Sequence, residues 1–280
     1  MENTSKLKII RTVLNVGAEK PFKVLHVTDS HITRGDIYRG RRTKTFSVDF
    51  ENCAEEYFFA AMRYAEESSM PVLHTGDLID FFSPENFDFI DKHFSGVDYI
   101  YAGGNHDFCH FLGKAKEDYA YKWEKIKDIA PHFKCSLYFD SRVIGGVNFV
   151  TLDNSYYFIT VGQLEALRAE AAKGLPIILA MHVPIYTEGL ARKVMEEHPC
   201  AYLCGAPKEL LAVYPEERRI QQTPDEATLR AIEYIKSEPL IKAVVTGHTH
   251  MNFEEARAEN LVQYTTHGSF AGFVREITVL

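Results

Sequence analysis

Short apolar runs recur along the chain, and each of them stops at one or more polar residues. The runs are rich in Val, Ile, Leu and Tyr and are bounded by Gly or Pro, a pattern that is typical of buried strands. They are KVLHV, PVLH, DYIYAGG, NFVTL, PIILA and KAVVTG, which begin at residues 23, 71, 98, 148, 176 and 242. The pattern therefore predicts a set of core strands distributed over most of the chain.

Segments with helical spacing separate these runs. Residues 49–67 place apolar side chains at intervals of three and four residues. Thr160 and Gln163 form a capping box that opens a second helix, and Gly174 is placed to close it. A third helix is predicted to open in the same way at Thr223, Pro224 and Glu226. Strands that alternate with helices indicate an α/β fold with substantial parallel pairing.

The chain has the size and composition of a globular protein. Its 280 residues are 46% hydrophobic and 25% charged, which excludes a mostly disordered chain. No internal repeat or Pro/Gly/Ser-rich linker divides the sequence, so we expect a single domain over residues 1–280. The stretch 186–240 shows little regular periodicity and is predicted to form a cap or lid, because long insertions near a site usually control access to it.

Charge and cysteine content narrow the class of partner. The net charge of −8 and the pI of about 5.9 argue against a stable nucleic-acid complex, which needs a basic surface. The five cysteines are scattered and odd in number, as expected for reduced thiols. No secretory or long apolar segment is present, so the prediction is a cytoplasmic protein without a membrane partner. The sequence does not specify an oligomeric state.

The polar residues at the strand ends carry the chemistry. In an open α/β sheet the carboxyl ends of the strands meet at one edge, where ligands bind. The groups brought there are two carboxylates, four imidazoles and one amide: Asp29, His31, Asp77, Asn105, His182, His248 and His250. This mixed nitrogen and oxygen set suits Mn, Fe or Zn. Seven groups suit two ions about 3.5–4 Å apart, which share a carboxylate and a bridging hydroxide and promote hydrolysis of phosphate esters.

The same residues form an ordered series of motifs. They are Asp-Ser-His from residue 29, Gly-Asp-Leu-Ile-Asp from 76, Gly-Asn-His-Asp from 104, His182, and Gly-His-Thr-His from 247. This series closely resembles that of the calcineurin-like metallophosphoesterase family. The resemblance implies a four-layer αββα sandwich, in which helices flank two mixed β-sheets, with a dinuclear metal site at the sheet edges.

The resemblance also implies a role for each matching residue. It implies that one metal is held by Asp29, His31 and His250, and the other by Asn105, His182 and His248. Asp77 would bridge the two ions. His106 would act on the leaving-group oxygen as a general acid or stabilise the transition state, paired with Asp80. A carboxylate beside an imidazole fixes its tautomer and raises its pKa, which suits proton donation.

Each residue taken alone also has a purely structural interpretation. Asp29 fits an ordinary turn, Asp77 and Asp80 fit the start of a helix, and Asn105 fits a left-handed turn position. His182 fits a half-buried histidine with its hydrogen bonds satisfied. The order of all these residues along the chain favours the metal-site hypothesis over the separate structural ones.

Candidate substrate-binding residues are less distinctive. Arg39, Arg41 and Arg42 follow the first motif and suit phosphate recognition, although a solvated basic loop explains them as well. Asn154 is a further candidate, and an Asx-turn explains it equally. The sequence thus predicts a phosphomonoesterase or phosphodiesterase for a small phosphorylated substrate, for which a nucleotide-like molecule is one candidate. The alternatives are a nuclease and a non-catalytic metal-bound scaffold on the same fold.

Overall fold

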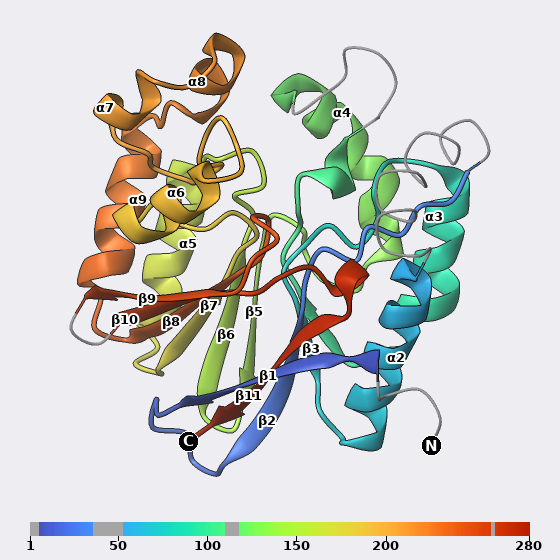
Figure 1. Ribbon diagram of the computed structural model, residues 1–280. Helices are drawn as coiled ribbons and strands as arrows, with labels where there is room; N and C mark the ends of the chain where they lie inside the picture. The colour runs from blue at the N-terminus through green and yellow to red at the C-terminus, as the bar shows by residue number, and fades with distance from the viewer. Residues whose placement is uncertain (1–5, 36–52, 110–117, 259–260) are drawn as a thin grey trace.

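A computed structural model describes residues 6–35, 53–109, 118–258 and 261–280. Two mixed β-sheets form the centre of this described part (Figure 1). The first sheet has the strand order β1 (Lys8–Leu14), β11 (Phe273–Val279), β2 (Phe22–Val27), β3 (Val72–His74) and β4 (Tyr99–Tyr101). In this sheet β11 is antiparallel to β2, and the other neighbouring strands are parallel.

The second sheet continues the same arrangement with six strands. Its order is β5 (Phe139–Ile144), β6 (Val147–Leu152), β7 (Ile177–Ala180), β8 (Ile241–Thr246), β10 (Leu261–Thr265) and β9 (Phe253–Ala258). The strands from β6 to β10 are parallel, and the edge strands β5 and β9 are antiparallel to their neighbours. The six apolar runs predicted from the sequence correspond to β2, β3, β4, β6, β7 and β8.

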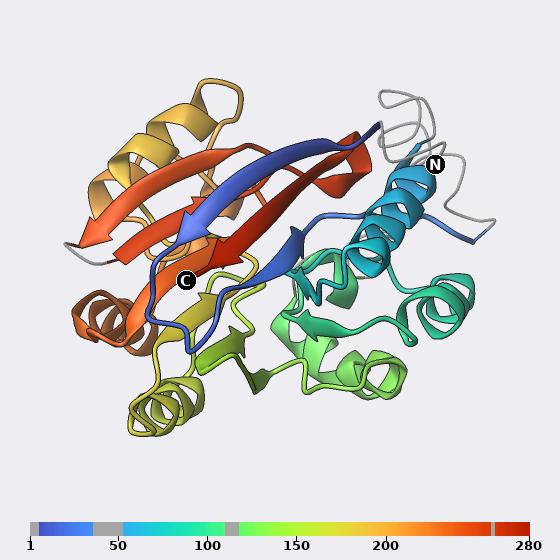
Figure 2. The same cartoon turned by 90° about the horizontal axis from the view of Figure 1, so that it is seen from below.

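Helices cover the outer face of each sheet, as the view from below shows (Figure 2). On the first sheet lie α2 (Ala54–Glu67), α3 (Pro84–Phe89), the π-helix η3 (Ile90–Phe94), α4 (Tyr119–Ile129) and the short helix η5 (Ala130–His132). On the second sheet lie α5 (Val161–Ala171) and α9 (Glu226–Ser237). The molecule is therefore the predicted α/β sandwich of four layers.

Three apolar clusters hold the layers together. Phe58 of α2 packs with Val27 and Val72 of the first sheet. Between the two sheets, apolar residues of β3 and β7 are among those that meet in a common cluster. The third cluster joins the second sheet to Leu167 of α5 and Ile235 of α9. Burial of these alternate strand positions fixes the register that places the strand ends side by side.

The helix predicted over 49–67 is observed as α2, which ends at Glu67 as expected; residues 49–52 of the predicted range lie outside the described residues. Thr160 and Gln163 make a reciprocal capping box at α5, and the amide of Gly174 (φ +76°) bonds the carbonyl of Ala171 where the helix ends. The α9 helix begins later than the predicted start at Thr223. Its N-cap is Asp225, whose side chain accepts a hydrogen bond from the amide of Thr228. Thr223 instead donates to a carbonyl of the preceding helix.

The predicted insertion 186–240 divides into two parts. The first part holds three short helices, α6 (Glu188–Met195), α7 (Lys208–Leu211) and α8 (Glu216–Gln222). α6 and α7 share an apolar cluster of their own, and Nε2 of Gln222 in α8 contacts Sγ of Cys200 in that cluster at 3.5 Å. The three helices stand at the end of the second sheet in Figure 1. We call the segment 186–223 the cap. The rest of the insertion forms α9, which belongs to the core. No helix in the described ranges is long and apolar enough to span a bilayer.

Candidate metal centre

The predicted donor residues all follow the carboxyl ends of strands and come from both sheets. β2, β3 and β4 of the first sheet lead into Asp29 and His31, Asp77, and Asn105. β7 and β8 of the second sheet lead into His182, and into His248 and His250. Except for His248 and His250, which are partly exposed, these residues are almost completely buried. The sheet-edge placement expected from the sequence is therefore what the structure shows.

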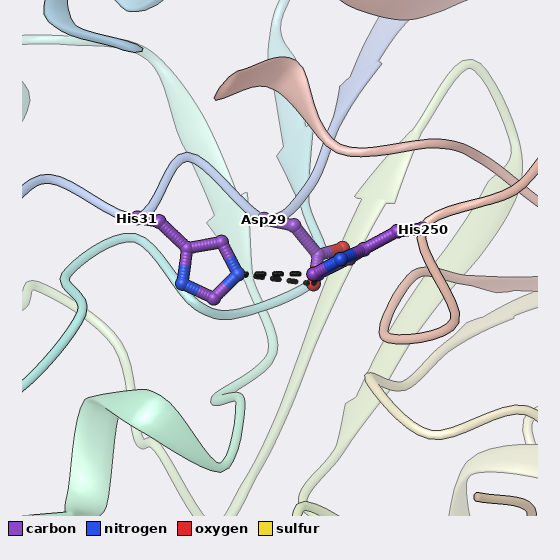
Figure 3. A group of neighbouring side chains, drawn as sticks. All are labelled: Asp29, His31 and His250. Atoms are coloured by element: carbon purple, nitrogen blue, oxygen red, sulfur yellow. Dashed lines mark hydrogen bonds and ion pairs between the residues drawn. The ribbon is translucent and has the colours of Figure 1, made fainter. Parts of the chain in front are cut away.

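Asp29, His31 and His250 form the first donor cluster (Figure 3). The Nε2 atoms of His31 and His250 lie 3.2 Å apart. Both of them face Oδ1 of Asp29, at 3.8 Å and 3.3 Å respectively. Three ligand-type atoms from two sheets thus converge on one point.

Asp77, Asn105, His182 and His248 form the second donor cluster. Its centre is Nε2 of His182, which lies 3.2 Å from Oδ2 of Asp77 and 3.0 Å from Oδ1 of Asn105. Nδ1 of His248 lies 3.1 Å from the same nitrogen. The other ring nitrogen of His248 contacts the hydroxyl of Tyr157 at 3.2 Å, so Nδ1 is the one directed at the cluster.

Asp77 lies between the two donor clusters. Its Oδ2 atom is 3.2 Å from Nε2 of His182 and 3.7 Å from Nε2 of His31. Its Oδ1 atom accepts a hydrogen bond of 2.8 Å from the amide of His106, which fixes the carboxylate plane. One carboxylate oxygen therefore faces both clusters, the arrangement that a bridging ligand requires.

The donor atoms fit bound cations. Nδ1 of His182 contacts the carbonyl oxygen of Thr75 at 2.6 Å and so carries a proton, which leaves Nε2 as the acceptor in the neutral, metal-binding form of the ring. This acceptor faces the oxygens of Asn105 and Asp77, and acceptors that face one another need a cation between them. Oδ1 of Asp29 is also buried without a well-formed hydrogen bond in the described structure. The set of donors is that of transition-metal sites.

The buried carboxylates favour positive charge on the donor histidines when no metal ion occupies the site. Burial disfavours the imidazolium form of His31, but Asp29 and Asp80 outweigh it and raise the pKa of His31 to about 10. In the same way Asp77 raises the pKa of His182 to about 9 despite burial. Burial favours the neutral carboxyl groups, yet the neighbouring histidines lower the pKa values of Asp29 and Asp77. Both carboxylates are thus ionised at neutral pH, and buried negative charge attracts cations.

The backbone at the donors is unusual. Asp29, His31, Asp77, His248 and His250 all have positive φ values, between 46° and 69°. Non-glycine residues rarely adopt this left-handed region, and such strain concentrates at functional sites. Each of these turns directs a side chain toward the common centre immediately after a strand ends.

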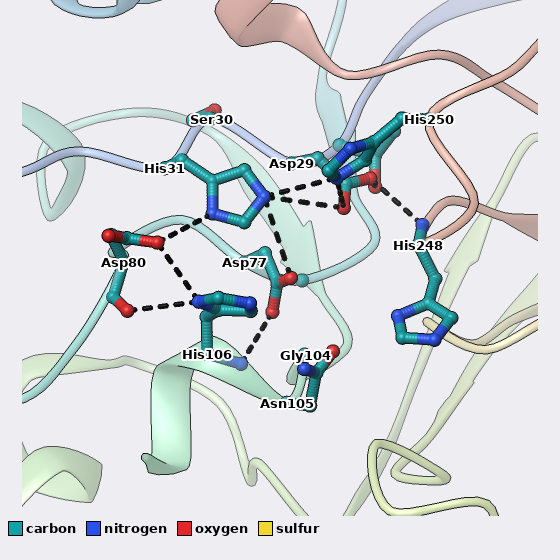
Figure 4. A network of polar contacts seen from close by, with 12 residues as sticks. Asp29, Ser30, His31, Asp77, Asp80, Gly104, Asn105, His106, His248 and His250 are labelled. Carbon is teal, nitrogen blue, oxygen red and sulfur yellow. Dashed lines mark hydrogen bonds and ion pairs between the residues drawn. The ribbon is translucent and has the colours of Figure 1, made fainter. Parts of the chain in front are cut away.

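His106 and Asp80 lie beside the first donor cluster (Figure 4). Oδ1 of Asp80 is 2.9 Å from Nδ1 of His106 and 3.1 Å from Nδ1 of His31. The backbone carbonyl of Asp80 also contacts Nδ1 of His106, at 3.0 Å. The structure thus brings together the pair expected from the sequence. It adds that the same carboxylate orients a candidate metal ligand.

Asp107 supports the site, a role that its place in the Gly-Asn-His-Asp motif did not predict. Its carboxylate accepts hydrogen bonds from the amides of Asp77 (3.0 Å), Ile79 (3.2 Å) and Gly104 (2.8 Å), and from the hydroxyl of Tyr101. Burial, followed by the charge of Asp77, raises the pKa of Asp107 to about 6. A carboxylate placed three residues after a glycine turn was the available signal for this function.

The absence of a side chain at Gly104 lets the turn after β4 lie directly against the turn that carries Asp77. A Cβ atom at Gly104 would lie 2.2 Å from Oδ1 of Asp77 and 2.3 Å from its amide nitrogen. Any side chain there would displace the carboxylate that faces both clusters. The glycine is therefore required by the packing of the two turns rather than by its own φ angle.

The remaining candidates lie elsewhere. Arg39, Arg41 and Arg42 fall in residues 36–52, outside the described residues. Asn154 is 1% exposed; its amide donates to the carbonyl of Val183 (2.7 Å) and accepts from the amide of that residue (3.0 Å). Both polar atoms of Asn154 thus support the segment that carries His182, and a substrate contact of this residue stays a prediction.

A cavity of about 240 Å³ opens over the donor clusters. One side is formed by metal-site residues, including Asp77, Asn105, His106 and His248. The other side is formed by residues of the cap that the sequence analysis did not identify as site residues: Val194, His198, Tyr202 and Arg218. Their sequence neighbourhood carries no strand pattern, so only the folded cap shows that they face the site.

Buried Asp and His clusters at the edges of a four-layer α/β sandwich define a metallophosphoesterase. The family model of the calcineurin-like phosphoesterases matches residues 22–252 of this chain. The protein belongs to this family, which consists of phosphoric ester hydrolases. No curated protein matches the chain.

Several solved structures are similar to this one. A dimetal phosphatase from Danio rerio matches with a TM-score of 0.51 and 14% identity, over 89% of this chain and 88% of that chain. A 5′-nucleotidase from Candida albicans gives a TM-score of 0.42 and 12% identity, over 95% of this chain and 46% of that chain. A phosphopantetheinyl hydrolase from Mycobacterium tuberculosis gives 0.41 and 10%, over 93% and 90%. At these identities the likeness concerns the fold alone.

Proposed function

We propose that this metallophosphoesterase hydrolyses a phosphoric ester of a small molecule at a two-metal site. The observation that carries the proposal is the position of Asp77, one oxygen of which faces His31 of the first donor cluster and His182 of the second. The first cluster would hold one ion and the second cluster the other, with Asp77 shared. Bound there, two ions would act as Lewis acids on the phosphoryl oxygens and supply a nucleophile at neutral pH.

The protein's own residues contribute orientation and proton transfer. We assign His106 as the group that donates a proton to the leaving oxygen. Because Asp80 engages Nδ1 of His106, the proton would come from Nε2. His106 lines the cavity with 18% of its side chain exposed, so a substrate can reach it. Asp80 is a positioning residue in this scheme.

The size of the cavity favours a small substrate. A volume of about 240 Å³ suits a phosphoryl group with a modest organic portion. It favours neither a folded protein nor a duplex, and the net charge of −8 opposes a nuclease. A non-catalytic scaffold does not require the His106–Asp80 pair beside the donor clusters, and this chain retains it.

The test is hydrolysis of phenyl phosphate and diphenyl phosphate, with metal content measured on the same purified sample. We expect about two Mn, Fe or Zn ions per chain. We also expect turnover that is lost with chelation and restored by adding the metal. The ratio of the two rates distinguishes a phosphomonoesterase from a phosphodiesterase. Full metal loading without turnover on either ester would favour the scaffold alternative.

A further inference from the structure

The cap provides a second wall to the cavity, chemically different from the metal side. Its lining residues are Val194, His198, Tyr202 and Arg218. Among the described residues that line this cavity, Arg218 is the only lysine or arginine. A guanidinium is permanently charged and presents a planar set of donors that matches carboxylate and phosphate groups. The cap side of the cavity therefore has the chemistry of an anion-binding site.

The position of Arg218 is defined by its contacts. Its Nη1 atom donates to Oε1 of Gln221 at 2.7 Å, one turn further along α8. The guanidinium carbon lies 5.3 Å from the centre of the Tyr202 ring, in the range of a cation–π contact. Arg218 is only half-buried, so it keeps a surface that a ligand can contact.

Tyr202 connects this arginine to the metal side. Its ring lies 6.2 Å from that of His248 and 5.9 Å from that of His198, with interplanar angles of 77° and 83°. Tyr202 also has a φ of +52°, in the left-handed region that tyrosine rarely adopts. The strain is concentrated at the residue that separates Arg218 from the second donor cluster.

Apolar packing fixes the position of the cap relative to the metal side of the cavity. Its apolar cluster includes Leu190, Val194 and Leu203, and it extends to Met251 and Phe253. Met251 directly follows His250. Tyr202, which contacts Arg218, packs against this cluster, and the cluster reaches the segment that carries two of the proposed metal ligands.

We propose that Arg218, supported by Tyr202, binds a second anionic oxygen group of the substrate. This deepens and rests on the proposed function: the phosphoryl group to be cleaved lies at the donor clusters, and a carboxylate or second phosphate of the same molecule reaches the cap. The substrate class is therefore small phosphoric esters that carry a second anionic group, separate from the phosphate that is cleaved.

The test compares three esters that differ only in the group para to the phosphate: phenyl phosphate, 4-carboxyphenyl phosphate and hydroquinone bisphosphate. Each is assayed with the wild-type protein, Arg218→Gln and Arg218→Lys. Arg219→Gln is the matched control, because Arg219 is the next residue of α8, is exposed and does not line the cavity. Dividing each variant rate by the wild-type rate for the same ester removes differences in intrinsic reactivity.

We expect Arg218→Gln to lower kcat/KM about tenfold or more for at least one of the two esters that carry a second anionic group. Phenyl phosphate should change by less than about threefold, which also shows that the variant is folded. Arg218→Lys should recover part of the loss, and Arg219→Gln should match wild type. A loss confined to the carboxylate or to the bisphosphate identifies the second group. An equal loss on all three esters would overturn the proposal and place Arg218 on the cleaved phosphoryl group.

A binding measurement separates this inference from the proposed function. Calorimetric titration with phenylphosphonate and 4-phosphonobenzoate, neither of which is hydrolysed, should show tighter binding of the second compound. Arg218→Gln should abolish that difference. If the preference is found without turnover on any ester, the anion site stands and the proposed activity fails. If the wild-type protein hydrolyses all three esters but shows no preference in either assay, the activity stands and the anion site is wrong.

Discussion

Oδ1 of Asp80 lies 2.9 Å from Nδ1 of His106, and the same oxygen also contacts His31. Asp80 therefore orients both the proposed proton donor and a candidate metal ligand. Asp80→Asn should lower kcat by roughly 10- to 100-fold, because the carboxylate that orients the His106 ring is lost. The loss should be larger for phenyl phosphate than for 4-nitrophenyl phosphate, whose leaving group needs little protonation. An equal loss for both esters would show that Asp80 does not act through His106.

His106→Ala should leave metal binding intact and lower kcat by about 10²- to 10⁴-fold, the usual contribution of a general acid. The measurement is metal content together with kcat on the two leaving groups. His132→Ala is a suitable control, because His132 pairs with Asp91 on the surface and belongs to neither donor cluster. Loss of metal from the His106 variant would mean that His106 is a ligand.

Asp77→Asn should weaken the binding of both metal ions, because a single oxygen of Asp77 faces both donor clusters. Metal occupancy should fall from about two ions per chain toward zero at the same free metal concentration. Titration of the metal-free protein, followed by elemental analysis, measures this. Asp88→Asn, an exposed change on α3, is the control. Retention of one tightly bound ion by the Asp77 variant would show that the carboxylate serves a single metal.

Asp107→Asn should lower the stability of the folded protein, in addition to any effect on catalysis. The substitution removes a charged acceptor that serves three backbone amides and a tyrosine hydroxyl. We expect the free energy of unfolding to fall by about 2–4 kcal/mol, since each hydrogen bond to a charged group contributes roughly 1.5–3 kcal/mol. Urea unfolding in the presence of chelator measures this without a contribution from metal. An unchanged urea midpoint would contradict the supporting role of Asp107.

His74 should make stability depend on pH. Burial lowers its folded-state pKa to about 3, from an ordinary value of 6.5. The unfolded chain therefore takes up the proton first, and stability is lost as the pH falls below 6.5. Protonation of His74 in the unfolded chain should lower the free energy of unfolding by about 1.4 kcal/mol between pH 7.5 and 5.5. His74→Gln should remove that part of the loss.

Urea midpoints of wild type and His74→Gln at pH 7.5 and 5.5 test this expectation. His74 bonds the Ser30 hydroxyl at 3.0 Å and accepts from the Gly76 amide at 3.2 Å, so the variant should be less stable at pH 7.5. The difference between the two proteins should narrow at pH 5.5. A constant difference at both pH values would mean that the pKa of His74 is the same in the folded and unfolded chains.

The sequence predicted the strands that are buried on both faces, because these read as continuous apolar runs. It did not identify β1 or β11, nor β5, β9 and β10 of the second sheet, in several of which polar and charged residues interrupt the apolar pattern. The donor residues were predictable because each directly follows a buried run. Their order along the chain matched one family, and the structure brings all seven into two adjacent clusters.

The rest of the site depends on folded context. Asp107 bonds backbone amides that are distant in sequence, so no residue pattern reveals its partners. Tyr202 and Arg218 reach the cavity only because the cap packs on the segment after β8. Asn154, a polar residue at a strand end, bonds the backbone of Val183 beside His182, a contact that its place in the sequence does not reveal.

Each donor cluster draws ligands from both sheets: Asp29 and His31 face His250, and Asp77 faces His182. An ion in either cluster would therefore cross-link the two halves of the sandwich, much as a reversible disulfide would. Metal supply would then govern the lifetime of the fold as well as its chemistry. At a free metal concentration a thousand times the dissociation constant, one such ion adds about 4 kcal/mol to the free energy of unfolding. Depletion of metal would loosen the joint between the sheets and expose the chain to proteolysis.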